Sequence, residues 1–90
     1  MLRIELVPDL DHCIETIARR KHAEFSQRLL GSEAGNSEME EKLEILRLFL
    51  ETADFRKLRS ESEKRLVNGR NVRFTVYLEG NTPKCEMHVT

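Results

Sequence analysis

The C-terminal stretch of the chain, residues 71–90, reads NVRFTVYLEGNTPKCEMHVT. Apolar and polar side chains alternate along it, on both sides of a turn supplied by the four residues 80–83, Gly-Asn-Thr-Pro. Alternation with a period of two is typical of strands that bury one face. The stretch therefore predicts a β-hairpin in which each strand has one apolar face. The apolar residues are Val72, Phe74, Val76 and Leu78 on the first strand and Cys85, Met87 and Val89 on the second.

The N-terminal residues 2–7, LRIELV, alternate in the same way and predict a further strand, which Pro8 ends. A helical stretch follows, for which Asp9 or Asp11 is the expected cap and Gly31 the expected end. Its apolar stripe includes Leu10, Cys13, Ile14, Ile17, Ala18, Phe25 and Leu29, with His22 on the same side.

A second helical stretch begins at a capping box, in which the Ser37 hydroxyl and the Glu40 carboxylate can each accept a backbone amide. It extends to a stop at Asn68-Gly69. One straight helix over 38–67 would be about 45 Å long, against about 30 Å for the first helix. We therefore expect a break near 52–54, where Thr52 and Asp54 can cap a new turn, and the pattern leaves open one bent helix or two.

These elements predict one α+β domain over residues 1–90, in the order β-α-α(-α)-β-β. Each strand has one apolar and one polar face, so the helices should cover one face of a small three-stranded sheet, antiparallel or mixed.

Composition excludes several classes of protein. The 90 residues are 39% hydrophobic and 34% charged, which is typical of a folded domain. Fifteen basic residues nearly balance sixteen acidic ones, so no overall field attracts nucleic acid or anionic lipid. No apolar run approaches the ~20 residues that span a bilayer, and the N-terminus is too polar for a signal peptide. We expect a cytoplasmic protein that does not bind membranes, with Cys13 and Cys85 reduced.

No motif in the sequence carries a recognisable chemistry. The soft metal ligands are His12, Cys13, His22, Cys85 and His88, and their spacing does not converge as in zinc sites. We therefore expect neither a metal nor another cofactor. No catalytic residue is assigned, because no nucleophile pairs with a histidine and no phosphate-binding loop is present. A small enzyme that uses His22 or His88 stays an alternative, which requires a pocket around one of them.

Charge is uneven along the chain, and residues 54–73 hold seven basic and three acidic side chains. Arg56, Arg59, Arg70 and Arg73 are the candidates for binding an anionic partner from this basic segment. Oppositely charged residues also recur there four apart, which is typical of a solvated helix face. Clustering of these arginines on one surface, away from Glu61 and Glu63, would favour binding of nucleic acid, whereas interspersed charges would favour a non-enzymatic interaction module.

The element order resembles that of small ribosome-dependent endoribonuclease toxins, which also place two helices between a first strand and a C-terminal sheet. This resemblance makes a nucleic-acid-associated or ribonuclease-toxin-like protein an alternative function for the basic segment. Those proteins are typically basic, however, whereas this chain is nearly neutral. We expect weak or no binding of nucleic acid.

The polar face of the predicted sheet carries Tyr77, with Arg73 and His88 among its neighbours. Tyrosine is enriched at protein interfaces because it combines a large ring with a polar tip. A small sheet that is covered on one side also leaves an edge to be paired or protected. We therefore expect a non-enzymatic interaction module that binds a protein partner, or a second copy as a homodimer, through its sheet face or edge.

Overall fold

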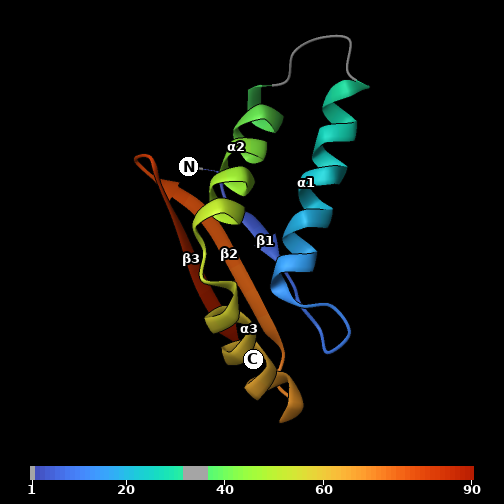
Figure 1. Cartoon of the computed structure of the whole chain (residues 1–90), viewed down its shortest axis with the longest axis vertical. Helices are drawn as coiled ribbons and strands as arrows, with labels where there is room; N and C mark the ends of the chain where they lie inside the picture. The colour runs from blue at the N-terminus through green and yellow to red at the C-terminus, as the bar shows by residue number, and fades with distance from the viewer. Residues whose placement is uncertain (1, 32–36) are drawn as a thin grey trace.

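The computed structural model describes residues 2–31 and 37–90. Its elements, in chain order, are β1 (Ile4–Leu6), α1 (Ile14–Leu30), α2 (Ser37–Thr52), α3 (Phe55–Val67), β2 (Val72–Glu79) and β3 (Thr82–Val89). The strands form one antiparallel sheet in the order β1-β2-β3, and the helices lie on one side of it (Figure 1). The α+β prediction is confirmed, and the sheet is antiparallel.

The start of α1 differs from the prediction. The Asp9 carboxylate accepts the amides of Asp11 and His12, at 2.8 and 2.7 Å, and so forms a turn before the helix. The residue at the N-cap is Cys13, so neither aspartate caps the helix. Leu10 lies in this turn with 64% of its surface exposed, and its expected place on the apolar stripe is wrong. An aspartate can stabilise a turn or a helix start with the same oxygen, and here the turn forms.

The long helical stretch divides into two helices at the expected place. Phe55 begins α3, and the Asp54 carboxylate caps it by accepting the amide of Lys57 at 3.2 Å. The Thr52 hydroxyl instead donates to the Leu48 carbonyl inside α2, at 2.7 Å. The break lets α3 continue along the sheet below α2, while α1 lies beside α2 (Figure 1).

The hydrophobic core lies between the helices and the sheet. Val72, Phe74 and Val76 face the helices from β2 and are buried, as predicted, while Leu78 is only partly buried. On the opposite face of β2, Thr75 is also buried, with only 4% of its surface exposed. The alternation of the sequence did not predict this burial. The other buried apolar residues are Ile4, Leu6, Ile14, Ala18, Phe25, Ile45, Leu46 and Phe49.

The hairpin turn is tighter than the sequence suggested. Glu79 pairs with Thr82, so only Gly80 and Asn81 connect the strands, and Pro83 belongs to β3. Gly80 has φ of +64°, which glycine adopts without steric cost. Across the described residues, no helix has both the length and the apolar character that a membrane span requires.

Candidate interaction surface

The face of the sheet away from the helices is polar and internally paired around Tyr77. The Tyr77 hydroxyl donates to Glu86 Oε1 at 3.1 Å, and this hydrogen bond raises the pKa of the tyrosine. The Arg3 guanidinium lies 5.0 Å from the centre of the tyrosine ring and 3.9 Å from the Glu86 carboxylate. Tyr77 is therefore contacted by Glu86 of β3 on one side and by Arg3, the residue before β1, on the other.

The other two predicted residues of this face lie opposite each other, because Arg73 of β2 pairs with His88 of β3. Arg73 approaches the Glu5 carboxylate at 3.9 Å, and His88 Nε2 lies 3.2 Å from the Thr75 hydroxyl. The structure thus brings Tyr77, Arg73 and His88 onto one surface. Ion pairs this exposed contribute only about 0–1 kcal/mol each, so they keep the face hydrated and ordered rather than holding the fold together.

The outer edge of β3 is the longest unpaired edge of the sheet. Within the described chain the sheet ends at β3, whose eight residues pair with β2 without a bulge. Asn71 and Thr90 exchange both backbone hydrogen bonds, each at 3.0 Å. Because such pairs alternate along an antiparallel ladder, the even-numbered residues of β3 bond to β2. The amides and carbonyls of Cys85, Met87 and Val89 therefore point away from the sheet.

An apolar groove runs beside this edge, between β3 and the junction of α2 with α3. Its volume is about 250 Å³, and its lining residues are Phe49, Thr52, Ala53, Asp54, Lys57, Leu58, Pro83 and Cys85. Partial burial there raises the pKa of the Cys85 thiol to about 11. The groove and the strand edge together offer apolar contacts beside backbone hydrogen-bonding groups.

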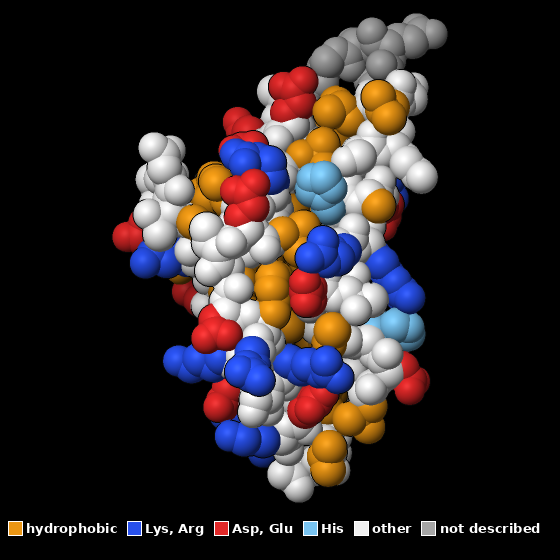
Figure 2. All heavy atoms as spheres, in the orientation of Figure 1, with side chains coloured by type: hydrophobic (Ala, Val, Ile, Leu, Met, Phe, Trp, Pro, Cys, Tyr) orange, Lys and Arg blue, Asp and Glu red, His pale blue; other side chains and the backbone are white. Residues whose placement is uncertain are grey.

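The three other candidate arginines of the basic segment do not join this surface. Arg59 pairs with Glu63 at 2.9 Å, and both Arg56 and Arg59 line a cleft between α1 and α3. Arg70 lies beyond α3, where its Nε atom is 3.4 Å from the Thr90 carbonyl. Figure 2 shows basic and acidic side chains interleaved over α3. The charges of the basic segment are therefore interspersed, not clustered.

A cleft between the start of α1 and α3 holds a feature that the sequence analysis missed. Its volume is about 390 Å³, and Cys13, Glu15 and Arg59 are among its lining residues. The Cys13 thiol lies 3.3 Å from the Thr16 hydroxyl, and hydrogen bonding by Thr16 lowers the pKa of the thiol. The available signal was a cysteine directly before a helix with threonine three residues later.

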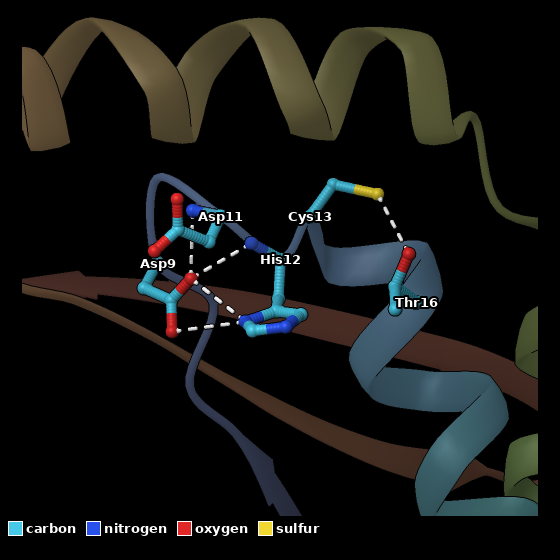
Figure 3. Close-up of polar contacts among 5 residues, drawn as sticks. All are labelled: Asp9, Asp11, His12, Cys13 and Thr16. Carbon is cyan, nitrogen blue, oxygen red and sulfur yellow. Dashed lines mark hydrogen bonds and ion pairs between the residues drawn. The ribbon is translucent and has the colours of Figure 1, made fainter.

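The nearest imidazole in the chain is not paired with this thiol. The His12 ring turns toward Asp9, whose Oδ1 lies 3.1 Å from Nδ1, while the Cys13 sulfur points toward Thr16 (Figure 3). No hydrogen bond joins the imidazole and the thiol within the described residues, so the cleft contains an acidified thiol without a paired base.

The histidines named as catalytic alternatives lie apart. His22 is partly buried on α1, and His88 borders a hollow of about 210 Å³ with Val7, Asn71, Val72, Arg73 and Thr90. Over residues 2–31 and 37–90, no three His, Cys, Asp or Glu side chains are grouped to hold a metal ion.

Comparison with known proteins places the chain by its family alone. No curated protein and no solved structure matches it. A protein-family model does match, over residues 1–88, which is nearly the whole chain. The chain belongs to that family.

Proposed function

We propose that this protein is a cytoplasmic, non-enzymatic interaction module that binds a protein partner along the outer edge of β3. The observation that carries the proposal is the uninterrupted eight-residue edge beside an apolar groove. An extended segment added to such an edge gains main-chain hydrogen bonds, while side-chain pockets next to the edge supply specificity.

We favour the edge over the polar face because the edge leaves backbone hydrogen-bonding groups without a protein partner, whereas the central side chains of the face already contact one another. On the face, Tyr77, Glu86 and Arg3 already contact one another. On the edge, backbone groups at Cys85 and Met87 point outward, where only water or another strand can pair with them. The opposite edge of the sheet is less suitable, because β1 has only three residues.

The interspersed charges of α3 support a protein partner rather than nucleic acid. Arg59 and Arg65 each pair with a glutamate one turn away, which reduces the positive field that a phosphate backbone would meet. Sheets that read single-stranded RNA stack two or three aromatic side chains on bases, and this sheet has Tyr77 alone on its polar face.

The proposal is tested by removing one outward-facing amide. In Met87→Pro the ring replaces an N–H that makes no bond to β2, so the hairpin should persist. Met87→Ala is the matched control, because it shortens the same side chain and keeps the amide. Quantitative affinity capture from native lysate should retain partners on the wild type and on Met87→Ala, and lose them on Met87→Pro.

Two outcomes would contradict the proposal. One is capture that is absent or indifferent to Met87→Pro while circular dichroism shows all three proteins folded. The other is sub-micromolar binding of generic RNA at about 150 mM salt with a steep salt dependence, which would favour the nucleic-acid function.

A further inference from the structure

We infer that the edge of β3 pairs with β3 of a second copy, antiparallel and with Cys85 opposite its own symmetry mate. The two three-stranded sheets would then form one continuous sheet across a two-fold axis. This inference rests on the proposed function, since it uses the same edge, and it names the partner and the register.

The hydrogen-bonding direction limits the registers that two β3 strands can adopt. Residues that face each other in a hydrogen-bonded pair must both point their backbone groups outward. On β3 these are the odd-numbered residues, beginning with Pro83, which offers only its carbonyl. Three registers remain central to the strand: Cys85 opposite Cys85, Cys85 opposite Met87, and Met87 opposite Met87.

Charge distinguishes these three registers. Cys85 opposite Cys85 places Lys84 opposite Glu86 of the second copy, and the two-fold axis repeats this pair. Cys85 opposite Met87 places Glu86 opposite Glu86, and Met87 opposite Met87 places Glu86 opposite His88. Opposite charges that face each other across strands stabilise a sheet, while like charges destabilise it. The first register is the one that forms two pairs of fully charged, opposite side chains.

Lys84 gives independent support for this choice. Its side chain is exposed on β3 and has no ion pair with any described residue of its own chain. The neighbouring carboxylate of Glu86 is instead held in place by the Tyr77 hydroxyl. A second copy in the inferred register supplies the missing carboxylate to Lys84 and receives a lysine beside Glu86.

On the side of the sheet that faces the helices, β3 of the second copy would lie next to the apolar groove. The inferred register places Met87 of the second copy opposite Pro83, which lines the groove together with Phe49 and Leu58. Neighbouring strands lie about 4.8 Å apart, so the methionine lies at the margin of this apolar surface. The half-buried Cys85 then gains cover from its symmetry mate.

Charge reversal tests the register directly. Lys84→Glu makes two Glu–Glu pairs at the interface, and Glu86→Lys makes two Lys–Lys pairs. Each single variant should weaken self-association by at least about tenfold, measured by sedimentation velocity over micromolar to submillimolar concentrations. The double variant Lys84→Glu/Glu86→Lys restores both opposite-charge pairs and should associate about as tightly as the wild type.

A mixture of the two single variants is the sharpest measurement. Each variant alone should self-associate at least about tenfold more weakly than the wild type, yet one copy of each regenerates both opposite-charge pairs and should form a heterodimer about as tight as the wild-type dimer. Amide exchange supplies a second readout: Cys85 and Met87 amides should become protected on association, while those of Glu86 and His88 are protected at every concentration. Arg73→Ala, on the polar face where its partner is Glu5 and not Glu86, should leave the dimer in place.

Failure of this inference is distinguishable from failure of the proposed function. A wild type that stays monomeric at every concentration overturns self-pairing, while loss of lysate partners in Met87→Pro would still support the edge as a docking site. A dimer that neither charge reversal weakens, or one abolished by Arg73→Ala in a folded protein, overturns the inferred register.

Discussion

Replacing Phe74 with alanine should remove a large part of the stability of this protein. Phe74 lies on the middle strand, opposite Leu6 of β1 and Met87 of β3, and it has no exposed surface. Truncation of a fully buried phenylalanine typically costs about 3–5 kcal/mol, through lost burial and the cavity that remains. At about 0.05–0.15 kcal/mol per residue, the free energy of unfolding of the whole chain is about 5–13 kcal/mol. Phe74→Ala should therefore leave a marginally stable protein.

The matched control is the next residue along the strand. Arg73 points to the polar face, where its pair with Glu5 spans 3.9 Å between half-exposed side chains. Arg73→Ala should change the free energy of unfolding by at most about 0.5 kcal/mol. Urea unfolding followed by far-ultraviolet circular dichroism gives both values, and Phe74→Leu should fall between them. Equal losses in Phe74→Ala and Arg73→Ala would refute the assignment of the two faces of β2.

Four further measurements examine the helix ends and the thiols. Asp54→Ala removes the cap on the Lys57 amide and should lower the free energy of unfolding by about 1 kcal/mol; no change in the urea midpoint would contradict the cap. Gly69 has φ of +80°, and a methyl group there would meet no atom within 4 Å, so Gly69→Ala should cost about 1 kcal/mol from backbone strain alone. Cys13, whose pKa is lowered, should react with a thiol reagent at least about tenfold faster than Cys85 at neutral pH, as read by mass spectrometry of the labelled peptides. The pKa of Cys85 is raised to about 11 in the folded protein, so the unfolded chain loses this proton first as pH rises. Stability should therefore fall by about 1 kcal/mol between about pH 9 and pH 11, after allowance for partial exposure, and less in Cys85→Ala.

Local patterns in the sequence were sufficient to predict the elements and their faces. Alternation at Val72, Phe74 and Val76 identified the buried face of β2, and the structure confirms it. Asp54 correctly indicated the start of α3, and Gly69 its end. These predictions succeeded because helix caps, breaks and strand periodicity depend on residues a few positions apart, whose chemistry can be read directly from the chain.

The candidate sites depended on contacts that no local pattern contains. Tyr77, Arg73 and His88 share a face by periodicity, but the engagement of Tyr77 by Arg3 arises because β1 returns to pair with β2. The cleft at Cys13 exists because α3 packs across the start of α1 and brings Arg59 toward the thiol.

The sequence by itself determined the order of the strands and helices and most of the residues on the apolar side of each. Tertiary structure alone decided that the sheet order is β1-β2-β3, and with it that β3 and not β2 lies at an edge. The same arrangement buries Thr75 on the polar face and opens the groove beside Cys85. The physical reason is that strand order and packing depend on residues more than sixty positions apart in the chain, such as Ile4 and Val76. The alternation of apolar and polar residues within one segment carries no information about which distant segment it pairs with.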